Sequence, residues 1–417
     1  MAAQIHIRLV TKQIKYAVPD TPFAVPCTVS CSELNSIVNG LIKDNNEERQ
    51  HGEIDFDFLV YGEVLRVPLN EHLEEHSISS EVIVEVEYFE RVPAPEPYDC
   101  LLHDDWVSAV QVRNGWILSG CYDNTLHLWT TKGRHQLTIP GHTGPIKAVA
   151  WVSFDDTMAT FVSASHDQTA MLWEWNVSSN AVECIHVCRG HERGLECVGI
   201  SPCKSRMATG GWDTRLKIWS ADIHEESNMS GETLPKRMKT EHGKSQVRTP
   251  LITLKGHKEA ISSVEWTDGS EICTASWDHT LRLWDTEIGG IKSEIVGNKS
   301  FFDASWSPLS RMLITASADR HIRLYDPRSK EGSLVKSTFT SHTVWVQCVK
   351  WSTTDEHLFI SGSHDHQVKL WDSRSPKAPL FDLRGHEGKV LCCDWSNPEL
   401  IVSGDSDNTL RIFHSNR

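Results

Sequence analysis

The sequence of 417 residues lacks the marks of several broad classes of protein. No apolar run approaches the roughly 20 residues that a membrane-spanning helix needs. The first 16 residues alternate polar and apolar side chains, which is unlike a secretory signal. None of the 12 cysteines forms a C-x-x-C pair, which favours free thiols in a reducing compartment. With 41 basic against 56 acidic side chains, the acidic balance argues against a protein that coats nucleic acid unaided and leaves a local basic patch as the alternative.

Catalytic signatures are also missing, and we expect a protein that is not an enzyme and holds no metal or cofactor of its own. There is no Gly-x-Ser-x-Gly elbow, no glycine-rich phosphate loop, and no histidine pair at metal-ligand spacing outside the repeats described below. Cys184, His186 and Cys188 lie close enough in sequence to suggest zinc. They fall in an expected outer strand, however, where buried thiols pack as small apolar groups.

Tryptophan and histidine are abundant, with 16 and 22 residues, and an internal repeat explains both. The repeat is marked by seven aspartates: Asp123, Asp167, Asp213, Asp278, Asp319, Asp365 and Asp407. A hydroxyl side chain precedes each of them by four residues: Ser119, Ser163, Thr209, Thr274, Thr315, Ser361 and Ser403. An aromatic side chain follows each by six residues: Trp129, Trp173, Trp219, Trp284, Tyr325, Trp371 and Phe413. Six repeats also have a histidine 20 to 25 residues upstream: His103, His142, His191, His257, His342 and His386.

Consecutive marker aspartates are 41 to 46 residues apart, except for one interval of 65. That spacing is typical of the four-stranded blade of a β-propeller. The repeats resemble those of the WD-repeat family, because Trp284-Asp285 and Trp371-Asp372 keep its closing dipeptide and four of the histidines follow a glycine. We therefore expect a mainly β protein with a seven-bladed propeller over residues 98–417.

The resemblance implies a structural role for the repeated residues. In the WD-repeat family the histidine, hydroxyl, aspartate and tryptophan of one blade form a hydrogen-bonded tetrad, in which each charge-assisted bond contributes roughly 1.5–3 kcal/mol. Blade five, with Asn298 and Tyr325, and blade seven, which ends on Phe413, are expected to be incomplete and soft. The complete tetrads expected are His142, Ser163, Asp167 and Trp173; His191, Thr209, Asp213 and Trp219; His257, Thr274, Asp278 and Trp284; and His342, Ser361, Asp365 and Trp371.

The closure of the ring can also be predicted. Only four residues follow Phe413, which is too few for an outer strand. We expect the segment around Tyr98–Leu102 to supply the fourth strand of blade seven, so that the two ends of the ring pair and no sheet edge stays exposed.

The residues before the ring, 1–92, carry no repeat and predict a small α+β domain of ubiquitin-like type. Residues 5–9 and 23–26 read as strands, and Ser32 is expected to cap a helix. Two further strands are expected at 55–60 and 82–88, the second with Val82, Val84, Val86 and Tyr88 on one face. The domain holds 7 basic and 16 acidic side chains, which gives it an acidic surface.

Two segments interrupt the folded parts. Residues 93–97, with Pro93, Pro95 and Pro97, predict a linker. Residues 221–250 account for the long interval between blades three and four, and their polar, aperiodic sequence predicts a disordered loop. Within this loop Lys236, Arg237 and Lys239 form a basic run that fits a nuclear import signal, with contact to RNA as the other interpretation.

The whole arrangement resembles the WD-repeat ribosome-biogenesis factors of the PeBoW complex. Particular stretches carry the match: Phe56–Leu59, Gly62–Arg66 and Ile78–Glu81 in the N-terminal domain, and His103–Trp106 and Ser276–Thr280 in the ring. Notchless proteins share the N-terminal domain but have an eighth blade, whereas seven repeats are present here. The repeat number therefore favours the PeBoW factors.

The resemblance implies a non-enzymatic scaffold that is required for pre-rRNA processing and for maturation of the large (60S) ribosomal subunit. It implies action in the nucleus, in nucleolus and nucleoplasm, with pescadillo, the second WD-repeat subunit of PeBoW and pre-60S particles as partners and with no membrane. A further implied partner is midasin, an AAA ATPase that releases the factor. Midasin's adhesion site holds Mg²⁺ and takes one carboxylate from its ligand, and the motif places that carboxylate at Glu81. The alternative is that Glu81 is a solvated residue opening the last strand.

The alternative function is that of a substrate receptor of a ubiquitin ligase. WD propellers and ubiquitin-like modules both occur in that pathway. The sequence has no F-box-type helical module, and the N-terminal domain runs into Arg91-Val92-Pro93 without the Gly-Gly by which such modules are conjugated. The scaffold interpretation is therefore favoured.

In the WD-repeat family, the residue directly before each marker aspartate lies on one rim of the propeller. Here these residues are Tyr122, His166, Trp212, Trp277, Ala318, His364 and Ser406. Aromatic side chains are favoured where proteins bind one another, so Trp212, Trp277 and Tyr122 are expected to contact partners. The alternative is that they stack on a neighbouring blade.

Overall fold

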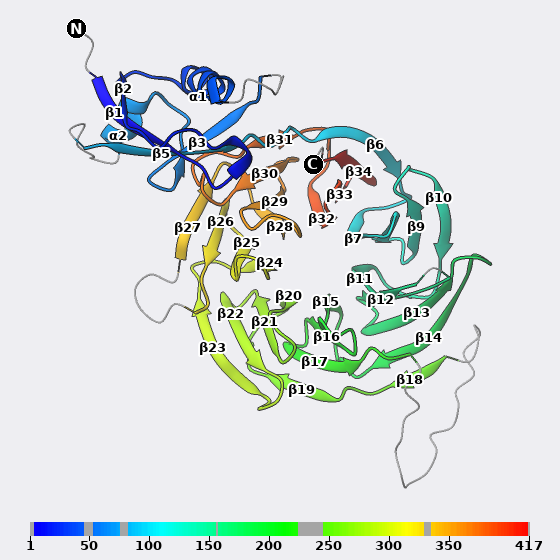
Figure 1. Ribbon diagram of the computed structural model, residues 1–417. Helices are drawn as coiled ribbons and strands as arrows, with labels where there is room; N and C mark the ends of the chain where they lie inside the picture. The colour runs from blue at the N-terminus through cyan, green and yellow to red at the C-terminus, as the bar shows by residue number, and fades with distance from the viewer. Residues whose placement is uncertain are drawn as a thin grey trace. The chain divides into compact units, whose positions relative to one another are not determined.

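The computed structural model describes residues 4–45, 53–75, 82–155, 157–223, 245–328 and 335–415. Two compact units divide the chain, residues 1–93 and residues 94–417 (Figure 1). The predicted mainly β class is confirmed. None of the described helices is both long and apolar enough to cross a bilayer.

The N-terminal unit is an α+β fold on one five-stranded sheet of order β2-β1-β5-β3-β4. β1 runs parallel to β5, and the other neighbours are antiparallel. Its elements are β1 (Gln4–Val10), η1 (Ile14–Tyr16), β2 (Phe23–Pro26), α1 (Cys31–Asn45), β3 (Phe56–Val60), β4 (Glu63–Val64), α2 (Leu69–Glu75) and β5 (Val84–Glu90).

The core of this unit follows from two periodicities. Alternation along β1 buries Ile5, Ile7 and Leu9 on one face of the sheet, and Leu34 and Val38, four residues apart on α1, pack into the same cluster. β4 and α2 were not expected, because two and seven residues are too short to show a period.

Two expected boundaries in the N-terminal unit are wrong. Ser30, rather than Ser32, caps α1: its backbone N–H donates to Glu33 Oε2 at 2.8 Å, and the Glu33 N–H donates back to Ser30 Oγ at 3.4 Å. β5 begins at Val84, so Val82 precedes the strand and is 55% exposed, whereas Val84 is buried.

The second unit is a ring of seven antiparallel blades, as predicted, with the first strand of each blade at the centre (Figure 1). Blades one to three are β7 (Val107–Arg113), β8 (Trp116–Cys121), β9 (Leu126–Thr130) and β10 (His135–Ile139); β11 (Ile146–Phe154), β12 (Met158–Ser165), β13 (Thr169–Asn176) and β14 (Ala181–Arg189); and β15 (Leu195–Ile200), β16 (Arg206–Gly211), β17 (Arg215–Ser220) and β19 (Ile252–Lys255). Blades four and five are β20 (Ile261–Trp266), β21 (Glu271–Ser276), β22 (Thr280–Asp285) and β23 (Gly290–Val296); and β24 (Phe301–Ser307), β25 (Met312–Ser317), β26 (His321–Tyr325) and β27 (Val335–Thr340). Blades six and seven are β28 (Val346–Trp351), β29 (Leu358–Ser363), β30 (Val368–Asp372) and β31 (Phe381–Leu383); and β32 (Val390–Asn397), β33 (Leu400–Asp405), β34 (Thr409–His414) and β6 (Glu96–Leu102).

The predicted closure is confirmed, because β6 pairs antiparallel with β34 as the outermost strand of blade seven. The strand starts earlier than expected, at Glu96, so Pro97 is paired opposite Phe413 instead of lying in a linker. Proline is tolerated there because an outermost strand has a neighbour on one side only. Leu101 is buried in the cluster that also holds Leu410 and Ile412.

The insertion between blades three and four is ordered at both ends, contrary to expectation. Ala221 is buried, and β18 (Gln246–Arg248) adds a fifth strand to blade two, parallel to β14. The Arg248 guanidinium donates to the Ser220 carbonyl at 2.8 Å and ties the two ends together. Lys236, Arg237 and Lys239 lie outside the described residues.

Closure by β6 leads to a prediction. Leu101→Ala should lower the free energy of unfolding of the propeller by about 2–5 kcal/mol, because it opens a cavity in the seam between β6 and β34. The matched control is Leu102→Ala, since Leu102 is 73% exposed on the same strand. Urea unfolding followed by tryptophan fluorescence measures both, and equal effects of the two substitutions would contradict the closure.

Candidate partner-binding face

The tetrads fix the turn between the second and third strands of a blade. In blade two, His142 Nδ1–H donates to Asp167 Oδ2 at 2.7 Å, the Ser163 hydroxyl donates to His142 Nε2 at 2.7 Å, and the Trp173 indole N–H donates to Ser163 Oγ at 2.8 Å. Asp167 also accepts the backbone N–H of Thr143 at 3.0 Å. One aspartate therefore holds its own turn against the loop that leads into the first strand.

The other three expected tetrads have the same contacts. Their three hydrogen bonds measure 2.7–2.9 Å in blades three, four and six. The residues brought together are His191, Thr209, Asp213 and Trp219; His257, Thr274, Asp278 and Trp284; and His342, Ser361, Asp365 and Trp371.

Blade seven departs from the expected pattern. His386 Nδ1 bonds Asp405 Oδ2 at 2.6 Å, so Asp405 takes the place expected for Asp407. Asp407 keeps the turn position, before Asn408 with its positive φ of 62°, and its side chain is exposed. A carboxylate two residues earlier, at the end of β33, reaches the histidine instead.

Blades one and five lack the histidine–aspartate bond for different reasons. In blade five Asn298 replaces the histidine, and Asp319 pairs with Arg323 at 2.7 Å. In blade one the histidine is present, but Nδ1 of His103 has no hydrogen-bond partner. Asp123 accepts the Thr125 hydroxyl at 2.7 Å, as Asp167 accepts that of Thr169 at 2.6 Å.

The rim residues lie where the second strand meets the loop before the first. The backbone N–H of Tyr122 donates to the Trp106 carbonyl, that of Trp277 to Ala260, and that of His364 to Trp345, each at 3.0 Å. Residues of these two segments therefore lie at the same end of the blades. Seven rings gather there, and we call them the aromatic belt: Trp106, Tyr122, Trp212, Trp277, Phe302, Trp345 and His364.

The belt is continuous over blades three to six. The ring centroids of Trp212 and Trp277 are 4.7 Å apart, those of Trp277 and Phe302 6.4 Å, those of Phe302 and Trp345 5.8 Å, and those of Trp345 and His364 5.8 Å. Trp212 and Trp277 thus stack on a neighbouring blade, which was the alternative to partner binding. The rings nevertheless remain open to solvent, with Trp212 39% and Trp345 49% exposed.

A buried ion-pair cluster extends the belt to blade one. Glu196 accepts the Trp212 indole N–H at 2.5 Å and the His166 Nε2–H at 2.7 Å, and it lies 3.5 Å from Lys147 Nζ. Lys147 in turn donates to the Tyr122 hydroxyl at 2.9 Å. Burial opposes ionisation of Glu196, but the His166 hydrogen bond and the Lys147 charge lower its pKa, so the carboxylate is ionised at neutral pH.

The sequence pointed to three members of the belt and missed others. Tyr122, Trp212 and Trp277 are expected because they are aromatic and precede marker aspartates, and His364 has the same place in its repeat. Trp106 and Trp345 were missed, although each follows a repeat histidine by three residues, a position at the same end of the blade.

Among the described residues, Cys184, His186 and Cys188 form no cluster with metal-ligand geometry; His186 Nε2–H donates to the Ile223 carbonyl at 3.0 Å.

The tetrads predict a loss of stability in acid. Burial would raise the pKa of Asp167, but the hydrogen bonds from His142, Thr169 and the Thr143 backbone lower it to about 2. Since the pKa of an unfolded aspartate is about 3.9, this stabilisation is complete above about pH 4 and is lost as the pH falls through about 2.

Asp167→Asn should therefore lower the free energy of unfolding by roughly 1–3 kcal/mol at pH 7, and the difference from the native protein should vanish by about pH 2. Asp407→Asn is the control, because the exposed Asp407 has the same place in the repeat without the histidine bond. Urea unfolding over a pH series measures both, and equal losses would refute the assignment.

Comparison with known proteins agrees with this architecture. A model of the NLE (NUC135) domain matches residues 5–73. The model of the WD domain, G-beta repeat, matches seven stretches: 98–130, 133–174, 182–220, 248–285, 291–326, 333–372 and 377–414.

Known relatives match over almost the whole chain. The ribosome biogenesis protein WDR12 homolog of Culex quinquefasciatus is 57% identical over 412 residues, which cover 99% of this chain and 96% of the relative. The WDR12 homolog of Aedes aegypti is 56% identical with the same coverage, and that of Drosophila pseudoobscura pseudoobscura is 58% identical over 414 residues, 99% of this chain and 96% of the relative. The chain therefore belongs to the WD-repeat family, in the group of WDR12 homologues that carry an NLE domain before seven WD repeats.

Proposed function

We propose that this protein is a non-enzymatic assembly factor in the biogenesis of the large ribosomal subunit, and that its propeller docks protein partners through the aromatic belt. The belt is the observation that carries the proposal. Three of its tryptophans are 39–49% exposed, although such side chains are normally buried in a monomer. The relatives whose alignments cover 99% of the chain are named as ribosome biogenesis proteins, which supports a role in ribosome biogenesis.

The chemistry of the belt favours a protein partner. Its rings are locked by their neighbours, so little side-chain entropy is lost on binding. Lys147 is neutralised by Glu196, which favours an apolar or peptide surface over a phosphate backbone. The resemblance supplies the candidates, pescadillo and the second WD-repeat subunit of the PeBoW complex, on pre-60S particles in the nucleolus and nucleoplasm.

The N-terminal unit is proposed to be the handle by which midasin releases the factor. Glu81 lies outside the described residues, but its neighbours in sequence are informative. Val82 and Ile83 are 55% and 48% exposed and precede β5, so an apolar pair follows the carboxylate directly. One donated carboxylate suits a Mg²⁺ ion, which takes oxygen ligands and few protein groups at once.

The midasin contact can be tested on the full-length protein. Binding to the adhesion-site domain of midasin is measured with Mg²⁺, with a chelator, and for Glu81→Gln. We expect the chelator and the substitution each to weaken binding at least roughly 100-fold, because each removes one side of the carboxylate–metal bond. Glu74→Gln, an exposed carboxylate on α2, is the control. Tight binding that ignores metal and Glu81 would contradict the handle.

The belt is tested by reconstitution of the complex with pescadillo and the second WD-repeat subunit. Trp345→Ala should weaken assembly by about 2 kcal/mol, or about 30-fold, if the ring lies at the centre of the interface. Ile288→Ala is the matched control, because Ile288 is 83% exposed and lies in the turn between β22 and β23, outside the belt. If a variant that carries both Trp345→Ala and Trp277→Ala assembles as well as the native protein, the belt is not the docking surface.

A further inference from the structure

Blade one differs from its sister blades at two positions that flank the turn aspartate. Two residues before the aspartate stands Cys121, where the other blades have Ser165, Gly211, Ser276, Ser317, Ser363 and Asp405. Four residues after it stands His127, where the other blades have Met171, Lys217, Arg282, Arg323, Lys369 and Arg411. A thiol and an imidazole thus replace, for the most part, a hydroxyl and a cation.

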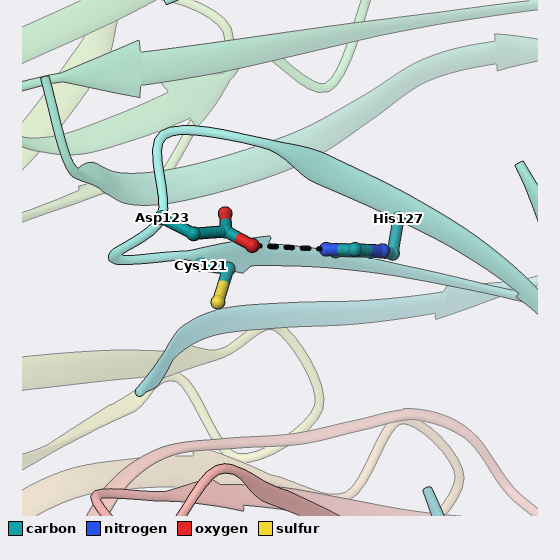
Figure 2. A group of neighbouring side chains, drawn as sticks. All are labelled: Cys121, Asp123 and His127. Carbon is teal, nitrogen blue, oxygen red and sulfur yellow. Dashed lines mark ion pairs between the residues drawn. The ribbon is translucent and has the colours of Figure 1, made fainter. Parts of the chain in front are cut away.

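These two replacements meet the marker aspartate of blade one. Sγ of Cys121, a carboxylate oxygen of Asp123 and a ring nitrogen of His127 all lie within 4.8 Å of one another (Figure 2). Asp123 Oδ2 is 3.7 Å from His127 Nε2, and Figure 2 shows the carboxylate directed at the imidazole. In the described part of the chain this is the one such group of histidine, cysteine and carboxylate ligands.

His103 also departs from the histidines of the complete tetrads. In the complete tetrads the equivalent nitrogen donates to the turn aspartate, whereas Nδ1 of His103 has no hydrogen-bond partner and the residue is only 8% exposed. The backbone of Leu101 interacts electrostatically with the His103 ring. The His103 ring instead lies against that of His127, with centroids 4.9 Å apart.

Two of the three ligand atoms make hydrogen bonds that a bound ion would replace. The Cys121 thiol donates to the Asp105 carbonyl at 3.2 Å, and His127 Nε2 lies 2.9 Å from the Thr125 hydroxyl.

The other surroundings suit a bound cation. His127 Nδ1 lies 3.4 Å from His135 Nε2 and 3.3 Å from the Thr138 hydroxyl, which orient the ring as outer partners of metal-bound histidines do. Asp123 is 22% exposed, which leaves a path for an ion and a water molecule. Within the described residues Asp123 pairs with no lysine or arginine, whereas Asp319 of blade five pairs with Arg323.

We propose that blade one binds a divalent transition-metal ion of the zinc class through Cys121 Sγ, the Asp123 carboxylate and His127 Nε2, with water in the fourth position. Sulfur, imidazole and carboxylate together are the ligands that zinc takes in proteins. The ion would join the two strands of the turn, β8 and β9, where the histidine–aspartate bond is missing. This proposal differs from the expectation, drawn from the sequence, that the protein holds no metal. The three ligands could not be recognised as a group from the sequence, because only the folded hairpin brings them together.

The test uses the full-length, metal-free protein titrated with Co²⁺, which reports a thiolate ligand by its charge-transfer absorption. We expect one equivalent to bind with this absorption. Cys121→Ser should abolish it, and His127→Lys should weaken binding by at least roughly 100-fold. Both substitutions restore residue types of the sister blades, so the ring should stay folded, which circular dichroism checks. Cys184→Ser is the control for the other thiols and should change nothing.

A second readout is thermal stability. Zn²⁺ should raise the melting temperature of the native protein and leave that of Cys121→Ser unchanged, because an ion stabilises only the state that binds it. The proposal is overturned if the native protein shows no thiolate absorption with Co²⁺, or if Cys121→Ser keeps it, since the ion would then sit on other cysteines.

Discussion

The hydrogen bond between a buried histidine and a turn aspartate is the interaction on which the candidate binding face depends. In blade six, Asp365 Oδ2 accepts both the His342 ring, at 2.8 Å, and the backbone N–H of Thr343, at 3.1 Å. Trp345 follows Thr343 by two residues, and His364 directly precedes Asp365. One carboxylate therefore sets the positions of two rings of the aromatic belt. In blades three, four and six the belt therefore rests on bonds that lie below the surface and that also join the strands of each blade.

The general architecture could be predicted from the sequence because the same pattern of residues recurs in seven repeats. A period of 41–46 residues identified the blades, and the missing outer strand after Phe413 identified the closure by β6. Details that depend on a single turn could not be predicted. Asp405 and Asp407 have the same side chain two residues apart, and only the path of the backbone decides which one reaches His386. The three-residue strand β18 is equally invisible, because its pairing with β14 is a tertiary contact.

The candidate sites also differ in whether the repeat pattern or only the tertiary structure reveals them. Rim residues that occupy one repeat position can be found by counting, whereas Phe302 joins the belt through contacts with Trp277 and Trp345 of the neighbouring blades. Three blades depart from the usual pattern, each in its own way: Arg323 pairs with the aspartate in blade five, a displaced carboxylate bonds the histidine in blade seven, and blade one brings a thiol and an imidazole to its aspartate. A repeat that departs from its sister repeats therefore indicates where the chain has a contact or a candidate site that the other blades lack.

The position of β6 has a mechanical consequence. The strand that closes the ring is also the first one reached from the N-terminal unit, which ends at residue 93. Tension on that unit arrives at Glu96, opposite His414, before it can load any other blade. A pull across the strand would separate β6 from β34 one hydrogen bond at a time from this end, and a pull along it would strain all of them together. The direction of an applied force, rather than its size alone, would decide whether the ring stays intact or opens by separation of β6 from β34.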